Sequence, residues 1–99
     1  MSADRHMASL CISAGHPSLP GHFPGHPVVP GVVLLDRVAA ALQAWRGDAV
    51  CGFPQVKFMT PLLPDQAAEL VLETTATPRV RFRILRGDTL IASGEIDTA

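Results

Sequence analysis

The chain has 99 residues, 47% of them hydrophobic and 17% charged, with a formal net charge of -1 and an isoelectric point near 6.4. This length predicts a single domain over residues 1–99, and the near-neutral charge argues against a nucleic-acid partner, which would need a basic surface. The hydrophobic fraction is high for so small a domain, so we expect a second subunit to cover part of the apolar surface.

The first predicted element is a strand over residues 7–13, where apolar residues such as Leu10 and Ile12 alternate with more polar ones. Residues 1–6 before it are expected to be a disordered leader. A loop over residues 14–31 follows, because its many prolines and glycines exclude a helix or a central strand. The loop is too apolar for a solvated linker, so we expect it to have a rigid shape.

A helix is predicted over residues 32–46, a segment without proline or glycine that is rich in leucine and alanine and is followed by Gly47 as a stop signal. Its apolar stripe consists of Leu34, Val38, Leu42 and Trp45. Further apolar residues continue almost all round the helix, which is typical of a helix buried on most sides. Asp36 is the one carboxylate in this run.

The rest of the chain is predicted to form antiparallel strands. These cover residues 50–59, 69–75, 79–84 and 89–97, with a proline-containing connection at 60–66 and a turn at Gly87 and Asp88. In the third of them, Val80, Phe82 and Ile84 alternate with arginines. A strand, a loop, one helix and then a run of strands predict an α+β fold in which a curved antiparallel sheet wraps one long central helix.

Cys11 and Cys51 lie far apart and have neither metal-binding nor redox spacing, so we expect reduced, buried thiols. No apolar stretch reaches the ~18 residues that a membrane span requires, and no secretory signal opens the chain. We therefore expect a cytoplasmic protein without a membrane partner.

Pro30 and Gly31 stand directly before the predicted helix, where backbone N–H groups are free and the positive end of the helix dipole lies. A glycine there lets a ligand approach the backbone closely. The Gly31 N–H is therefore a candidate donor to a thioester oxygen that gains negative charge. The alternative is that Pro-Gly is only a favourable sequence for starting a helix.

His22 and Asp36 are the candidate base and acid. An imidazole titrates near neutrality, so His22 could remove a proton; the alternative is an ordinary loop histidine. Asp36 would be desolvated by its valine and alanine neighbours, which favours the protonated acid; alternatively it pairs with Arg37 or faces water. Together with the Gly31 N–H, this pair suits abstraction of a proton beside a carbonyl coupled to loss of a β-hydroxyl.

These residues form a pattern that resembles the signature of the 3-hydroxyacyl-acyl-carrier-protein dehydratases. The pattern consists of His22-Phe23-Pro24-Gly25, Pro27, Pro30-Gly31-Val32 and Asp36. Val56-Lys57-Phe58 and Leu63-Pro64-Asp65-Gln66 resemble a later landmark of the same family. The resemblance covers roughly residues 8–97 and implies the hot-dog fold. The short length is similar to that of dehydratases in specialised acyl pathways such as those of aryl-polyene pigments.

The resemblance implies a homodimer, or a higher even oligomer, whose two sheets join and whose active sites combine His22 of one chain with Asp36 of the other. It implies that His22 removes the C2 proton, that Asp36 assists loss of the C3 hydroxyl as water, and that the Gly31 N–H holds the thioester oxygen. The product would be a trans-2-enoyl thioester.

The resemblance further implies that the substrate arrives on the phosphopantetheine of an acyl carrier protein, so that neither a further cofactor nor a metal is needed. The residues implied to contact the substrate are Phe23, Pro24, Gly25, Val32 and Phe58. A metal site at His16, His22 and His26 is disfavoured, because Pro24 and Gly25 exclude the helix that would align them.

Four arginines, Arg79, Arg81, Arg83 and Arg86, have two interpretations. They form the solvated face of a strand, or they contact an acidic carrier protein or the phosphate of its arm. Two rival functions also remain: a thioesterase on the same fold, and a dehydratase-like subunit that binds acyl carriers without catalysis. The His-Phe-Pro-Gly turn argues against the thioesterase, and the presence of both candidate catalytic residues argues against the non-catalytic subunit.

Overall fold

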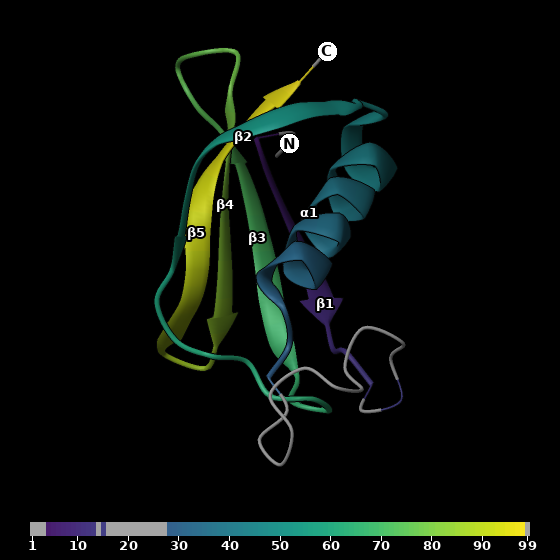
Figure 1. Ribbon diagram of the computed structural model, residues 1–99. Coiled ribbons are helices and arrows are strands. Elements are labelled where there is room, and N and C mark those ends of the chain that lie inside the picture. The colour runs from purple at the N-terminus through teal and green to yellow at the C-terminus, as the bar shows by residue number, and fades with distance from the viewer. Residues whose placement is uncertain (1–3, 14, 16–27, 99) are drawn as a thin grey trace.

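The computed structural model describes residues 4–13, 15 and 28–98. In chain order the elements are β1 (Arg5–Leu10), α1 (Gly31–Arg46), β2 (Val50–Phe58), β3 (Ala68–Thr74), β4 (Val80–Arg86) and β5 (Thr89–Thr98). The strands form one antiparallel sheet in the order β1-β3-β4-β5-β2, and α1 lies across one of its faces (Figure 1). The predicted α+β fold, with one helix packed against an antiparallel sheet, is confirmed.

The first strand begins earlier than predicted. Arg5 and His6 belong to β1, so the expected disordered leader is wrong at these two residues, while residues 1–3 lie outside the described part of the chain. Because both residues are polar, the apolar alternation that predicted the strand does not extend to them. This part of β1 is stabilised by pairing, with His6 opposite Leu72 on β3, and by stacking of the His6 ring on Trp45 with 5.6 Å between ring centroids.

The core lies between α1 and the inner face of the sheet. Alternation along β4 buries Val80, Phe82 and Ile84, as predicted, and turns the arginines between them to the outer face. From the helix, the buried residues are Val33, Leu34, Val38 and Leu42. Phe53 of β2 joins this core by meeting Phe82 edge to face, with 6.0 Å between ring centroids.

The helix is less buried than predicted. The sheet of one chain covers only one of its sides, so Val32, Asp36, Ala40 and Ala44 are exposed along another. These positions are four residues apart and therefore share a face of α1. The expectation of a helix buried on most sides is wrong for a single chain, and this uncovered face contains the candidate acid.

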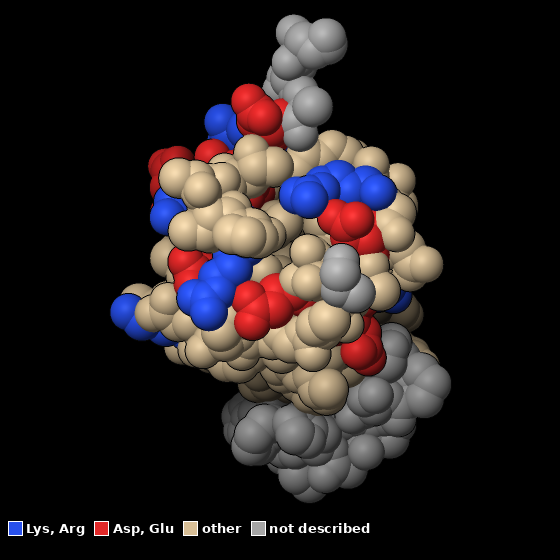
Figure 2. All heavy atoms as spheres, turned by 90° about the horizontal axis from the view of Figure 1, so that it is seen from above, with Lys and Arg blue, Asp and Glu red and all other residues tan. Residues whose placement is uncertain are grey.

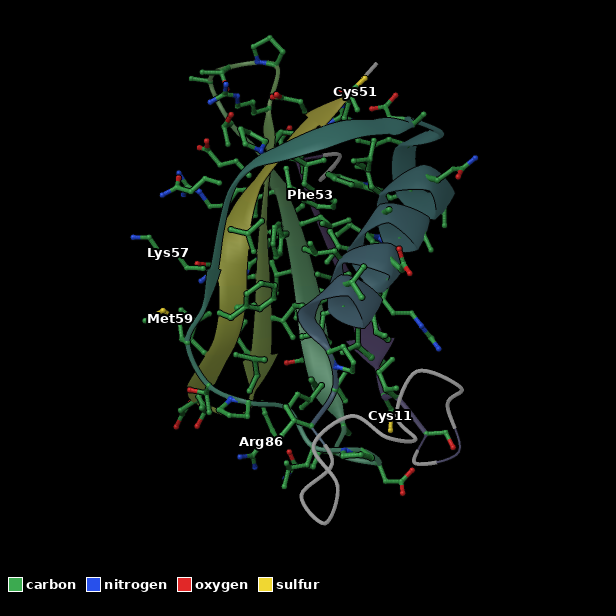
Figure 3. The ribbon with its side chains drawn as sticks, viewed as in Figure 1. Cys11, Cys51, Phe53, Lys57, Met59 and Arg86 are labelled. Carbon is green, nitrogen blue, oxygen red and sulfur yellow. The ribbon has the colours of Figure 1, made fainter. Side chains whose placement is uncertain are left out.

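Both cysteines differ from prediction, since Cys11 and Cys51 are exposed free thiols (Figure 3). Cys11 follows β1 at a position that alternates away from the buried Leu10 and Ile12. Cys51 lies on β2, at the edge of the sheet, where the pairing with β5 is irregular between Val50 and Gln55. Outward-facing positions, rather than the apolar character of the residue, decide their exposure. Among the described residues, no helix is long and apolar enough to cross a membrane.

Candidate active site at the start of the helix

The start of α1 has two backbone donors without an acceptor among the described residues. The helix begins at Gly31, after Pro30 in an extended conformation, with no side-chain cap and no acidic residue in the first turn. The Pro30 carbonyl accepts from the N–H groups of Val33 (3.0 Å) and Leu34 (3.4 Å). The N–H groups of Gly31 and Val32 have no acceptor among the described residues. Unpaired donors at the positive end of a helix suit a developing oxyanion.

The ring of Phe58 lies directly against Gly31. A Cβ built on Gly31 would come within 2.6 Å of Phe58 Cζ and within 3.0 Å of its Cε1. Any other residue at this position would therefore displace the ring. Phe58 ends β2 and is 54% exposed, so it is not a core residue of the single chain. Glycine at the helix start therefore lets the Phe58 ring lie directly against the backbone of α1.

The segment that leads into the helix is fastened to the connection after β2. Val29 N–H donates to the Leu62 carbonyl at 2.9 Å, and Met59 N–H donates to the Ile91 carbonyl at 2.8 Å. Asp65, in the left-handed conformation with φ 65°, donates its N–H to the Ile12 carbonyl at 2.8 Å. The connection after β2 therefore contacts two segments: Leu62 holds the residues that lead into the helix, and Asp65 of the sequence landmark binds the residues that follow β1.

A pocket of about 500 Å³ opens beside Gly31. Its walls are residues 28–31, Leu34 and residues 58–62, and they are mainly apolar. From the sequence we did not single out Met59, at the end of a predicted strand, or Leu62, in a segment interpreted only as a connection; the available signal was the apolar character of both residues close to Pro61. A mainly apolar pocket with free N–H groups at one wall suits a molecule with an apolar chain and one polar group.

Asp36 lies on α1 beyond this pocket, and its side chain is exposed. The expected desolvation is wrong for one chain, because the neighbouring Val32 and Ala40 are themselves exposed. The predicted alternative of facing water therefore describes the single chain. No ion pair joins Asp36 to Arg37 in the described structure. Adjacent helix positions point in different directions, which explains the lack of that pair.

Arg79 and Arg83 belong to charge pairs on the sheet. Arg79 contacts Glu95 at 3.4 Å and Asp97 at 2.9 Å, and Arg83 contacts Glu73 at 3.0 Å. Figure 2 views the upper end of the molecule and shows basic and acidic side chains interleaved rather than a single basic field. For these two arginines the interpretation as a solvated, charged strand face accounts for the contacts.

Arg81 and Arg86 form no ion pair within the described residues. Arg86 ends β4 at the same end of the molecule as the start of α1 (Figure 3), whereas Arg79 lies before the other end of the strand. At ~3.3 Å per residue this strand separates them by about 23 Å. The four arginines therefore do not form one patch beside the helix start.

Several predicted site residues lie outside the described part of the chain. They are His22, Phe23, Pro24 and Gly25, together with His16 and His26 of the disfavoured metal site. Elsewhere in the described ranges, no group of three or more His, Cys, Asp or Glu side chains could hold a metal ion.

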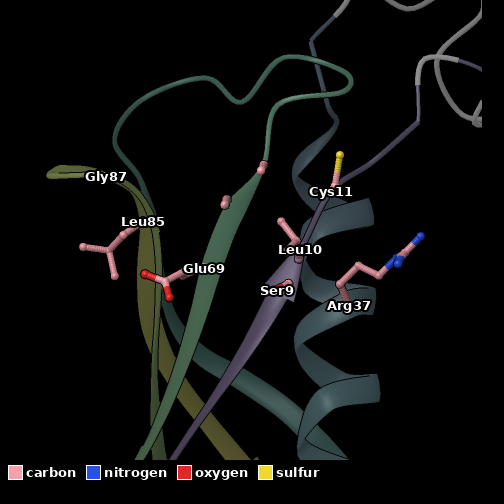
Figure 4. Close-up of a pocket in the computed structure, with 9 residues that line it drawn as sticks. Ser9, Leu10, Cys11, Arg37, Glu69, Leu85 and Gly87 are labelled. Atoms are coloured by element: carbon pink, nitrogen blue, oxygen red, sulfur yellow. The ribbon is translucent and has the colours of Figure 1, made fainter.

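A second hollow, of about 450 Å³, lies at the end of β1 (Figure 4). Cys11 and Glu69 contribute to its lining, and Arg37 extends from α1 on the side away from Glu69. It brings together none of the candidate catalytic residues.

Comparison with known proteins gives concordant results. A sequence model of the ApeI-like family, described as ApeI dehydratase, matches residues 1–95. The 3-hydroxyacyl-[acyl-carrier-protein] dehydratase FabZ of Thermus thermophilus is 37% identical over 87 residues, covering 86% of this chain and 51% of that protein. FabZ of Myxococcus xanthus is 32% identical over 73 residues, covering 63% and 48%. The chain thus spans about half the length of the curated relatives it matches.

Structural neighbours agree. The dehydratase heterocomplex ApeI:P from Xenorhabdus doucetiae matches with a TM-score of 0.84 and 26% identity, covering 99% of this chain and 89% of that one. A probable thioesterase from Bartonella henselae matches with a TM-score of 0.67 at 16% identity over 97% and 89%, which shows the fold alone. These neighbours confirm the hot-dog fold predicted for the chain. With nearly its whole length matched, this chain belongs to the ApeI-like family of hot-dog dehydratases.

Proposed function

We propose that this protein removes water from a 3-hydroxyacyl thioester carried on acyl carrier protein and forms the trans-2-enoyl thioester. The observation that carries the proposal is the start of α1, where the N–H of Gly31, which has no acceptor in the described part of the chain, adjoins a mainly apolar pocket of about 500 Å³. An acyl chain fits the apolar walls, and the thioester oxygen fits the N–H. Membership of a dehydratase family supports the same reaction.

In the proposed reaction, His22 takes the proton from C2 of the substrate, and negative charge develops on the thioester oxygen. The Gly31 N–H stabilises that charge through a hydrogen bond directed along the helix dipole. The electron pair then forms the C2–C3 double bond as the C3–O bond breaks. Asp36 of the partner subunit gives a proton to the departing hydroxyl, which leaves as water. Proton transfer from His22 back to the Asp36 carboxylate through solvent restores both groups.

The proposed active unit is a homodimer. Val32, Phe58 and Met59 are 65%, 54% and 60% exposed, and all three lie at or beside the helix start. Asp36 is on the uncovered side of the same helix. The edge strand β2 leaves one row of its backbone groups unpaired by the sheet of its own chain. A second copy joined at β2 would cover these apolar side chains and place its own helix near the site.

A related chain could take the place of the second copy, since the structural neighbour from Xenorhabdus doucetiae is named as a heterocomplex. Size-exclusion chromatography with light scattering distinguishes the two assemblies. The homodimer proposal expects a dimer of the purified chain at micromolar concentration. A monomer that becomes active only after addition of a related subunit would support the heterodimer instead.

The dehydration itself is tested by incubating purified protein with 3-hydroxyacyl carrier protein and measuring intact mass. We expect the mass of the acyl carrier to fall by one water, and His22→Ala and Asp36→Asn each to lower the rate by at least about 100-fold. His6→Ala and Asp88→Asn are matched controls that change the same residue types elsewhere. We expect wild-type rates for both at a temperature where His6→Ala, which loses the stacking on Trp45, is folded. No loss of water with wild type, or full activity in both site variants, would refute the proposal.

The same assay separates the rival functions. A thioesterase would release the free thiol of the carrier, which a thiol reagent detects, with no dehydrated product. A non-catalytic subunit would bind the acylated carrier without changing its mass. Parallel reactions with the coenzyme A thioester show whether the carrier protein is required for turnover.

A further inference from the structure

Phe58 contacts the start of α1 on the helix side of the sheet. Its strand partner on β5 is Ala92, which is fully buried, so Phe58 occupies a β2 position that faces the helix side of the sheet. Lys57, the preceding residue, points away from α1 (Figure 3). The Phe58 ring lies against the Cα of Gly31, where a side chain would begin, yet remains 54% exposed. The ring therefore forms the part of the pocket wall that lies next to the Gly31 N–H.

The position of this wall relative to the N–H follows from helix geometry. The Cα–Cβ direction in a helix tilts toward the N-terminus, and the free N–H groups of the first turn also point past that end. The Phe58 ring occupies the Cβ direction of Gly31. An oxygen that accepts a hydrogen bond from the Gly31 N–H therefore lies next to the ring. The carbon atoms beside that oxygen have the ring as a neighbour.

We propose that Phe58 is a specificity-determining residue that restricts the enzyme to 3-hydroxyacyl thioesters without a substituent at C2. This inference rests on the proposed function. The thioester carbonyl has two neighbours, the sulfur of the carrier arm and C2. The sulfur is the same in every substrate, so only a group on C2 changes what the ring must accommodate. A methyl branch at C2 would meet the ring while the carbonyl stays bound to Gly31.

The test compares kcat/KM for an unbranched 3-hydroxyacyl carrier protein with that for its 2-methyl-branched counterpart, which keeps one C2 proton and can lose water. Exclusion of one methyl group by a packed wall corresponds to a preference of roughly 10- to 200-fold. We expect wild type to prefer the unbranched substrate by at least about tenfold. Phe58→Ala should reduce this preference to near unity, mainly by raising turnover of the branched substrate.

Three further variants make the test more discriminating. Phe58→Leu retains part of the wall and should give an intermediate preference, even if Phe58→Ala folds poorly. Lys57→Ala, on the opposite face of the same strand, should keep the wild-type preference. The double variant Gly31→Ala with Phe58→Ala should be more active than Gly31→Ala alone, because the added Cβ no longer meets the ring.

The outcomes separate this inference from the proposed function. If wild type dehydrates the unbranched substrate but Phe58→Ala and Phe58→Leu keep its preference, the role of Phe58 is refuted and the dehydratase proposal stands. If wild type dehydrates both substrates equally, the inference is also refuted. If wild type dehydrates neither, the proposed function fails and the inference fails with it.

Discussion

The backbone N–H of Val29 donates a hydrogen bond of 2.9 Å to the carbonyl oxygen of Leu62. This bond joins the segment that leads into α1 to the connection that follows β2. The Leu62 side chain beside it is 1% exposed and belongs to the core. The location of Gly31, and with it the free N–H of the candidate site, is therefore set by residues distant in the sequence.

Replacing Leu62 by alanine tests this support. We expect Leu62→Ala to lower the free energy of unfolding by about 2–5 kcal/mol, because a fully buried side chain leaves a cavity. The rate of dehydration at a temperature where the variant is folded should also fall, since the cavity lets the backbone at residue 62, whose carbonyl holds Val29, shift. Chemical denaturation and the mass assay give the two quantities.

The adjacent Leu63 is the matched control, because it is 44% exposed. Leu63→Ala should change the free energy of unfolding by no more than about 0.5 kcal/mol and leave dehydration unchanged. Equal losses of stability in the two variants would contradict the assignment of Leu62 as the buried support.

The sequence predicted those parts of the fold in which apolar periodicity is strong. The alternation of Val80, Phe82 and Ile84 located β4 and its inner face, and the uninterrupted leucine and alanine run located α1. The start of β1 was missed because Arg5 and His6 are polar. Their place in the strand depends on pairing with β3 and on the ring of Trp45, which local patterns do not reveal.

The candidate site was predictable in part. The sequence pattern identified Gly31 and the landmark around Asp65. In the structure, Leu62, just before that landmark, holds the segment that leads to Gly31, whereas Asp65 binds Ile12. The contact of Phe58 with Gly31 was not predictable, because alternation indicates which face of the sheet a residue lies on but not which residue of the helix it contacts. The expected burial of Asp36 was wrong for one chain, because apolar neighbours do not distinguish a core face from a face left for another subunit.

Gly94 allows β5 to pack closely against β2. A Cβ at this position would collide with the carbonyl oxygen of Gln55 and come within 2.8 Å of the Phe82 ring. Because the collision involves backbone, we expect Gly94→Ala to lower the free energy of unfolding by about 1–3 kcal/mol. Thermal denaturation followed by circular dichroism measures the loss.

Gly52, on the same strand pair, is the control, because a Cβ at this position would meet no described atom within 4 Å. Gly52→Ala should leave stability within about 0.5 kcal/mol of wild type. A Gly94→Ala protein as stable as Gly52→Ala would show that β5 can shift away from β2 without cost.

Carrier-protein contact should depend on Arg86 more than on Arg79. Arg86 has no ion pair among the described residues and lies at the end of the sheet where α1 begins, whereas Arg79 is engaged by Glu95 and Asp97. We expect Arg86→Ala to raise KM for the carrier-linked substrate several-fold with little change in kcat, and the effect to weaken at high salt.

Arg79→Ala should leave KM near the wild-type value and reduce stability by no more than about 1 kcal/mol, because its ion pairs are exposed. The same variants assayed with a short thioester that lacks the carrier protein give the control, in which Arg86→Ala should behave as wild type. A larger rise in KM for Arg79→Ala than for Arg86→Ala would place the carrier elsewhere on the sheet.

The most direct test of a dehydratase site shared between two chains is complementation between His22→Ala and Asp36→Asn. Each variant alone should be almost inactive. After subunit exchange, half of the dimers should be mixed, with one of their two sites intact, so the mixture should recover about a quarter of wild-type dehydration. Intact-complex mass spectrometry confirms that mixed dimers form. Mixed dimers that remain as inactive as the separate variants would contradict the shared site and, with it, the account of how this chain removes water.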